Sequence, residues 1–132
     1  MAKGKQIHQE RQAMLNRVAK VIVKRCKSKC ELCHASGSLH LMEVPPISKG
    51  DVDAQNCIMV CNTCNQQINH DHDDKLNAHH WMCLHESIWS ELPVVQVMSW
   101  RMLRRLSKHH AWAGEVLDQA YLAEDVLTWA QS

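Results

Sequence analysis

Two cysteine pairs of the form Cys-x-x-Cys carry the most specific chemistry in this sequence. The first pair is Cys30 and Cys33, and the second is Cys61 and Cys64. A two-residue gap lets both sulfurs of a pair reach one ion from a single tight turn, and two such turns complete a tetrahedron. The spacing therefore predicts one structural Zn²⁺ held by all four thiolates. Because four thiolates close the coordination sphere, this ion would have no open position at which to activate water.

Three further cysteines lie outside the two pairs. Cys26 and Cys57 each precede a predicted ligand by four residues and could compete for the metal. We expect the Cys-x-x-Cys quartet to bind it, and Cys26 and Cys57 to pack as small apolar residues. Cys83 lies between Met82 and Leu84, which favours a buried thiol. Redox sensing by Cys83 is the alternative, and it would require an exposed side chain.

A second group of metal-type ligands lies in the polar stretch 69–80. Imidazoles and carboxylates are adequate ligands for zinc or manganese, so a second metal site is one interpretation. No predicted helix fixes their positions, however, and we expect an exposed polar loop. The residues concerned are His70, Asp71, His72, Asp73, Asp74, His79 and His80.

A basic amphipathic helix is predicted over residues 6–27, directly before the first cysteine pair. This stretch contains neither Gly nor Pro. Its apolar residues near helical spacing are Ile7, Met14, Val18, Val21 and Ile22. Lys and Arg fill the other faces and crowd the last turns, where they complement the negative end of the helix dipole. Residues 1–5 are expected to form a frayed basic tail.

A zinc finger is predicted over residues 28–68. Residues 39–44 could form a brief strand, and residues 57–60 form a second apolar run. The segment 61–68 is predicted to begin a helix at the second cysteine pair. A cysteine turn, a hairpin and a helix that starts at the second pair are typical of a treble-clef or zinc-ribbon module.

The C-terminal part, residues 81–132, is predicted to be helical. Ser90 is an expected N-cap for a helix over 91–108, and shorter helices are predicted over 111–120 and 123–130. The region holds all five tryptophans: Trp81, Trp89, Trp100, Trp112 and Trp129. Trp side chains can stack on nucleic-acid bases. Their placement among Leu and Val favours packing in the core instead.

Charge is distributed unevenly along the chain. The net charge is +1, but residues 1–30 contain nine Lys or Arg and one Glu, whereas residues 31–132 contain six basic and thirteen acidic residues. Such asymmetry is typical of a basic arm that binds nucleic acid, and also of two halves that dock on each other. The helix 6–27 could follow a phosphate backbone. Without an element that reads bases, it would bind DNA or RNA weakly and with strong salt dependence.

Length and composition indicate one cytoplasmic domain over residues 1–132. Apolar residues make up 45% of the chain, enough for a core. No segment approaches the roughly 18 apolar residues of a membrane span, and the N-terminus lacks the apolar region of a signal peptide. Seven cysteines without an export signal indicate a reducing compartment.

The cysteine pairs and the Trp-rich segment together resemble a known family. The pairs read CELC and CNTC, and residues 80–97 read HWMCLHESIWSELPVVQV. These segments, with 101–106 and 117–122, are similar to the N-terminal zinc-binding region of the PhnA-like family of proteobacteria. The resemblance covers roughly residues 25–130. It implies zinc binding, but the alkylphosphonate operon that names the family does not establish phosphonate chemistry. The resemblance does not extend to the β-rich C-terminal domain of longer relatives.

A second resemblance is to the metal-stabilised scaffold of HNH endonucleases, through the first cysteine pair and residues 56–65. Those enzymes use a His general base on the hairpin, beside a catalytic metal. Residues 42–46 of this sequence read MEVPP at that place, so the expected His is missing, although His40 lies three residues before Glu43. An enzyme would be favoured if these two residues, or the histidines of 69–80, converged on a second cation.

These patterns predict a mainly α-helical protein with a four-cysteine zinc finger between the basic helix and the Trp-rich helical part. The first functional hypothesis is a non-enzymatic zinc-binding protein that presents a surface to a protein or nucleic-acid partner. The second is a metal-dependent hydrolase, either a degenerate HNH-type endonuclease or a phosphonate-related enzyme. The sequence contains no Gly-rich phosphate loop, Gly-x-Ser-x-Gly or His-Glu-x-x-His motif.

Overall fold

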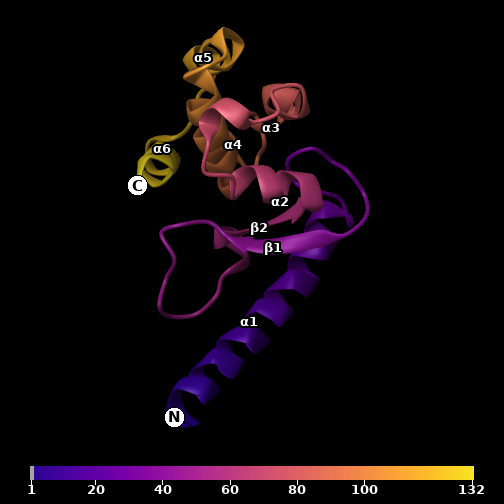
Figure 1. Cartoon of the computed structure of the whole chain (residues 1–132). Helices are drawn as coiled ribbons and strands as arrows, with labels where there is room; N and C mark the ends of the chain where they lie inside the picture. The colour runs from indigo at the N-terminus through magenta and orange to yellow at the C-terminus, as the bar shows by residue number, and fades with distance from the viewer. Residues whose placement is uncertain (1) are drawn as a thin grey trace.

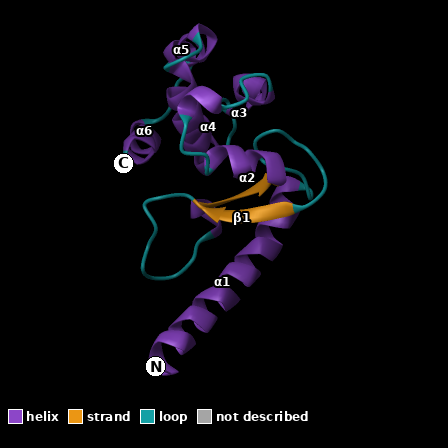
Figure 2. Cartoon of the chain, viewed as in Figure 1, coloured by secondary structure: helices purple, strands orange, loops and turns teal. Residues whose placement is uncertain are grey.

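The computed structural model describes the backbone of residues 2–132 and the side chains of residues 4–132. The helices are α1 (Ala2–Cys26), α2 (Asn62–Ile68), α3 (Leu84–Ser87), α4 (Pro93–Ser107), α5 (Ala111–Gln119) and α6 (Glu124–Gln131). The strands β1 (Leu39–Glu43) and β2 (Cys57–Cys61) pair antiparallel. The chain is therefore mainly helical with a small two-stranded sheet, as predicted (Figure 2). None of the described helices is long and apolar enough to cross a membrane.

Helix α1 begins earlier than the sequence pattern predicts. It is helical from Ala2, so the frayed tail expected for residues 1–5 is wrong, apart from residue 1, which lies outside the described residues. The physical reason is that Gly4 alone costs only about 1 kcal/mol relative to Ala in a helix. The neighbouring Ala and Lys residues are good helix formers, so the helix continues through the glycine.

The end of α1 is set by backbone conformation rather than by a breaker residue. Lys27 and Ser28 adopt φ values of 55° and 61°, in the left-handed region that closes helix C-termini. The Ser28 N–H donates to the Val23 carbonyl at 3.0 Å, which satisfies one of the last free carbonyls of the helix. The helix therefore ends at Cys26, one residue before its predicted end.

The β1–β2 hairpin lies between α1 and the helical part (Figure 1). All five residues of β2 are buried because both faces of this strand are covered. Cys57 and Met59 pack with Ile22 of α1, whereas Ile58 and Val60 belong to the large core under the other helices. This alternation is the period of two expected of a strand.

The first half of α1 extends away from the rest of the molecule, as Figure 1 shows. The last turns of the helix are anchored by Ile22, which is fully buried. Near the free end, Arg11 pairs with Glu43 and donates to the Gly50 carbonyl at 3.2 Å. Ile7 is 58% exposed.

Helix α4 forms the centre of the helical part and packs against α3, α5 and α6. Its N-cap is Leu92, so the N-cap predicted at Ser90 is wrong. The Ser90 hydroxyl instead accepts the Leu92 N–H at 3.1 Å and closes a turn before the helix. Pro93 occupies the first helical turn, where its missing N–H is tolerated.

The tryptophans divide between core and surface. Trp81 is fully buried, and Trp100, Trp112 and Trp129 are half-buried against the core. The predicted core packing is therefore confirmed for these four tryptophans. Trp89 is 54% exposed, so the prediction that it packs in the core is wrong. It lies in the turn after α3, where Ile88 takes the inward position and directs the next side chain outward.

Arginines of α4 connect the hairpin region and the segment after α2 to the helical part. Arg101 donates to the carbonyls of Pro45, Trp129 and Ala130 at 2.7–3.1 Å. Arg105 pairs with Asp73 at 2.6 Å. These contacts join the β1–β2 loop and the stretch after α2 to the helices.

Candidate metal centre

The first cysteine turn follows directly after α1. Within it, the Cys33 N–H donates to the Cys30 sulfur at 3.5 Å, and the His34 N–H donates to the Cys30 carbonyl at 2.9 Å. His34 has a φ of 64°, in the left-handed region, and this conformation lets the chain reverse. The Cys30 N–H then reaches the Ala35 carbonyl at 2.9 Å. The turn thus presents both sulfurs from one compact loop.

The second cysteine turn joins β2 to α2. Cys61 is the last residue of β2 and the N-cap of α2, and its sulfur accepts the Cys64 N–H at 3.4 Å. A sulfur here takes the place of the oxygen that usually caps a helix. Both turns therefore point a backbone N–H at a sulfur, an arrangement that favours the thiolate form.

A buried ion pair holds the first turn against β2. Glu31 is 7% exposed, and its carboxylate pairs with Arg25 at 2.7 Å and accepts the Met59 N–H at 2.9 Å. The Glu31 N–H donates to the Met59 carbonyl at 2.9 Å. Arg25 also donates to the carbonyls of Ala54 and Cys57. Sequence reasoning missed this pair, because no local pattern indicates that Glu31 is buried beside the end of α1.

These elements bring the four predicted ligands together. The sulfurs of Cys30, Cys33, Cys61 and Cys64 all lie within 4.8 Å of one another. The Cys30–Cys64 and Cys33–Cys61 sulfur distances are 3.7 and 3.5 Å. A tetrahedral zinc with bonds of about 2.3 Å places its sulfurs roughly 3.8 Å apart, so the observed spacing fits that geometry. Three of the four residues are buried and Cys33 is half-buried. The cluster could therefore hold a metal ion.

The electrostatics of the cluster favour a cation. A hydrogen bond with Cys64 lowers the pKa of the Cys30 thiol to about 4, and the same bond raises the pKa of Cys64 far above its ordinary value. Burial, together with the negative charge on Cys30, raises the pKa of Cys33 to about 11. Four sulfurs this close cannot all ionise while they repel one another. A bound divalent cation removes this conflict because it attracts every thiolate.

The polar stretch 69–80 does not gather its candidate ligands into a second site. Asp73 pairs with Arg105 and Lys108, and those cations hold the pKa of its carboxyl below the usual value. His70 and His72 lie edge to face at 5.8 Å, and His79 is exposed. Within residues 4–132, the four cysteines alone form a group of three or more metal-type side chains at coordination distance.

His80 is brought to the cysteine cluster, a position that the sequence did not predict. Its Nε2 lies 3.1 Å from the Cys64 sulfur. Burial lowers the pKa of His80, which favours the neutral ring. The Asn77 side chain accepts the His80 N–H at 3.1 Å, but this local turn gives no signal of the approach to Cys64, which depends on how the segment packs against α2.

The residues considered for HNH-type chemistry are engaged elsewhere. His40 hydrogen-bonds with Asn62, and Glu43 forms an ion pair with Arg11. Neither converges with the histidines of 69–80 on a common position in the described structure.

The remaining cysteines differ in burial. Cys57 is fully buried beside Ile22, as expected of a small apolar residue, and burial raises the pKa of its thiol to about 11. Cys26 is half-buried against the same cluster. Cys83 is half-buried as well, and burial raises the pKa of its thiol to about 12.

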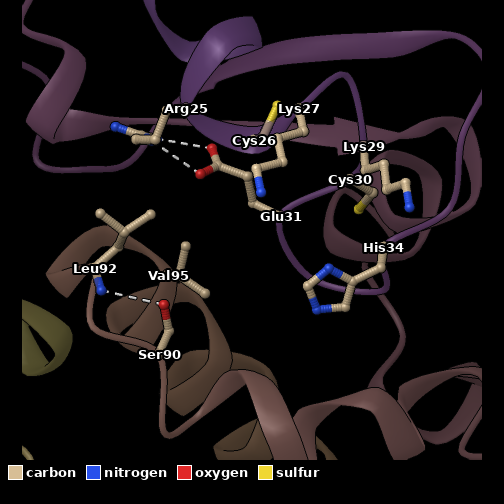
Figure 3. Close-up of a pocket in the computed structure, with 10 residues that line it drawn as sticks. All are labelled: Arg25, Cys26, Lys27, Lys29, Cys30, Glu31, His34, Ser90, Leu92 and Val95. Atoms are coloured by element: carbon tan, nitrogen blue, oxygen red, sulfur yellow. Dashed lines mark hydrogen bonds and ion pairs between the residues drawn. The ribbon is translucent and has the colours of Figure 1, made fainter.

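A cavity of about 360 Å³ lies beside the first cysteine turn (Figure 3). Lys27, Lys29 and His34 line one side, and Leu92 and Val95 of the helical part line the other. Arg25 and Glu31 also line this cavity, and the dashed lines in Figure 3 show that they pair with each other.

Comparisons with protein-family models, with curated proteins and with solved structures found no match for this chain. The fold and the site therefore define its class: a mainly helical protein with a four-cysteine cluster that is compatible with zinc binding.

Proposed function

We propose that this chain is a cytoplasmic zinc-binding protein of the PhnA-like family, and that its zinc is structural. We further propose that it acts without catalysis, by presenting the basic helix α1 to nucleic acid. The order of a cysteine turn, a hairpin and a helix supports a treble-clef-like module. Free thiols throughout residues 4–132 suit a reducing compartment such as the cytoplasm.

Zinc is supported by the chemistry of the donor set. Four cysteine sulfurs at tetrahedral spacing are the usual ligands of structural zinc, and soft thiolates disfavour Mg²⁺, Ca²⁺ and Mn²⁺. The four residues Cys30, Cys33, Cys61 and Cys64 would fill the coordination sphere. The bound ion would contribute folding free energy by joining the end of α1 to α2.

The proposed family membership rests on the sequence resemblance, and a segment that carries it contacts the cysteine cluster. The segment 80–97, which carries the resemblance, contains His80 at the cysteine cluster and Trp81 in the core. It then continues through Leu92 into α4. A phosphonate-related or nuclease activity finds less support, because Glu43 pairs with Arg11 rather than facing a second cation.

The observation that carries the nucleic-acid proposal is the free basic surface of α1. Its exposed cations Lys5, Arg17, Lys20 and Lys24 make no ion pair or hydrogen bond within residues 4–132. Lys5 lies in the first half of the helix, which extends from the molecule (Figure 1), and the other three lie in the second half with exposed side chains. Exposed cations along one helix can contact a phosphate backbone, and each neutralised phosphate releases counterions.

The test is the salt dependence of binding to a labelled DNA duplex and to an RNA of equal length, measured by fluorescence anisotropy. The α1 variant is Lys20→Gln/Lys24→Gln, and the matched control is Lys49→Gln/Lys75→Gln. All four lysines are exposed. Because each lost phosphate contact removes roughly 0.9 from the slope of log K against log salt, we expect the α1 variant to lose up to about 2 from that slope.

The control variant should keep the affinity and the slope of the unchanged protein. Equal losses in both variants would mean that α1 has no special role. Polyglutamate of matched charge density serves as a competitor. Competition as strong as that of DNA would indicate an acidic protein partner instead of nucleic acid.

A further inference from the structure

Among the described residues, His80 makes the one side-chain hydrogen bond to a sulfur of the cluster from outside the two cysteine turns. Its Nε2 is 3.1 Å from the sulfur of Cys64, which is itself fully buried. The neighbouring His79 is exposed. Of these two adjacent histidines, only His80 therefore points toward the cysteine cluster.

The position of His80 is fixed by a small hydrogen-bond network. The Gln67 side-chain oxygen, on α2, accepts the Asn77 N–H at 2.8 Å and the Trp81 indole N–H at 3.1 Å. The Asn77 side chain in turn accepts the His80 N–H at 3.1 Å. Because Gln67 and Cys64 are one turn apart on α2, the network attaches the segment of His80 to the helix that carries the sulfur.

Packing holds the same geometry. Trp81 is fully buried, and its ring lies edge to face with that of His80 at 4.9 Å and 81°. A residue held between a buried indole and a helix side chain loses little additional freedom when it makes a hydrogen bond. The His80–Cys64 contact is therefore preorganised rather than an incidental surface approach.

The chemistry of the contact follows from charge. Four thiolates around one Zn²⁺ leave a net charge of about −2 in a largely buried cluster. A neutral imidazole with its proton on Nε2 donates an N–H···S hydrogen bond to one thiolate and spreads this charge. Hydrogen bonds to ionised acceptors are stronger than neutral ones, and the partly buried setting strengthens them further.

We propose that His80 is a positioning residue of the metal centre, which donates a hydrogen bond from Nε2 to the Cys64 thiolate and slows release of the bound metal. This inference rests on the proposed zinc site. His80 is not assigned as a ligand, because four sulfurs that lie within 4.8 Å of one another are enough to fill a tetrahedral coordination sphere. Outer hydrogen bonds of this kind typically change metal affinity 10- to 100-fold.

The kinetic experiment measures transfer of zinc from the purified protein to a chromogenic chelator. The variants are His80→Ala, which removes the donor, and His80→Gln, which keeps a side-chain N–H. His79→Ala, one residue away and exposed, is the matched control. We expect about one zinc per chain in all four proteins. Transfer should be roughly 10-fold or more faster for His80→Ala, intermediate for His80→Gln and unchanged for His79→Ala.

A spectroscopic readout separates hydrogen bonding from general loosening of the fold. With ¹¹³Cd in place of zinc, the cadmium resonance reports its four ligands, and a proton on His80 Nε2 should show coupling to the metal through the sulfur. We expect the unchanged protein to show a cadmium resonance in the range of four sulfur ligands. In His80→Ala the resonance should shift but remain within that range. Far-UV circular dichroism checks that each variant is folded.

Two results would overturn the role of His80 while leaving the zinc site intact. One is that His80→Ala matches His79→Ala in both transfer rate and cadmium resonance. The other is a three-sulfur, one-nitrogen resonance in the unchanged protein, which would make His80 a ligand. A folded, unchanged protein that binds neither metal would overturn the proposed zinc site and this inference together.

Discussion

Among single residues, Arg25 and Glu31 show how the metal ligands are positioned. Glu31 sits between two cysteine ligands of the sequence motif, yet its side chain is 3% exposed and points back to α1 and β2. Arg25 uses its guanidinium to join Glu31 with two carbonyls of the finger. This pair connects the end of α1, the first cysteine turn and β2, so it sets where the two cysteine turns meet.

Removal of Arg25 should therefore be costly. Because Arg25→Met leaves the buried Glu31 carboxylate without its cation, with only the Met59 N–H still donating to it, we expect a loss of about 3 kcal/mol in the free energy of unfolding. The control Arg11→Met breaks the ion pair between Arg11 and Glu43, and both of these side chains are partly exposed. This variant should therefore lose less than about 1 kcal/mol in the free energy of unfolding. Urea denaturation of the metal-loaded proteins measures both. Equal costs for the two variants would contradict the structural role given to Arg25.

The pKa of Cys83 leads to a second expectation at this scale. Burial raises the pKa of the Cys83 thiol to about 12. At pH 8 the ionised fraction of this thiol is then roughly 10⁻⁴, about 1,000-fold smaller than for a thiol with the ordinary pKa of 9.0. Iodoacetamide should therefore modify Cys83 slowly in the native protein and quickly after denaturation, with a native rate that rises as pH approaches 12. Peptide mass spectrometry follows the site. Fast native labelling at pH 8 would support the alternative of a redox-sensing cysteine.

At the scale of elements, α1 joins two different environments. Its last turns are covered by the hairpin, through Ile22 and its neighbours, whereas its first half is held mainly by Arg11. A short helix in water is marginally stable without a packing partner. This division leaves the C-terminal end of α1 fixed beside the first cysteine turn, while the outer side of the helix, including Lys20 and Lys24, stays exposed.

The contact between the segment after α2 and helix α4 gives a pH-dependent expectation. Lys108 and Arg105 hold the pKa of Asp73 below its usual 3.8. The stabilisation is therefore complete above pH 3.8 and is lost as pH falls through the lowered value. We expect Asp73→Asn to cost about 1 kcal/mol at pH 7 and the difference from the unchanged protein to shrink toward pH 3.

Asp74→Asn is the control for this comparison, because Asp74 is exposed and makes no ion pair in the described structure. Thermal unfolding is measured for the unchanged protein and both variants at each pH. Because acid affects the metal site equally in all three proteins, the differences between them report the Asp73 ion pair. A deficit of Asp73→Asn that stays constant down to pH 3 would show that the ion pair is not its origin.

At the scale of the whole molecule, many local features were predictable from the sequence, although the start of α1 and the N-cap of α4 were not, and most contacts between distant segments were not. The cysteine spacing predicted the cluster, and the ends of α5 and α6 fall within one residue of the predicted helices, because both depend on neighbouring residues. The exposure of Trp89 and the approach of His80 to Cys64 depend on how distant segments pack. Periodicity cannot report such contacts.

Removal of the metal should destabilise the cysteine-containing region more than the C-terminal helices. Chelation leaves the crowded thiols of residues 30–64 without a cation, so we expect the hairpin and α2 to lose protection from hydrogen exchange. Helices α4, α5 and α6 should keep more of theirs, because α4 packs directly against α5 and α6 and because Leu103, Leu106 and Ala113 are fully buried. Hydrogen-exchange mass spectrometry with and without chelator measures this. Uniform protection after complete metal removal would mean that the ion contributes little to folding.

The proposed function and the role of His80 both depend on one zinc ion that is bound by four sulfurs and has no open position. Elemental analysis combined with zinc X-ray absorption of the purified protein measures both the metal content and the ligands. We expect about one zinc per chain and four sulfur neighbours at about 2.3 Å. A folded protein without metal, or a zinc ion with a nitrogen or oxygen ligand such as water, would contradict this expectation.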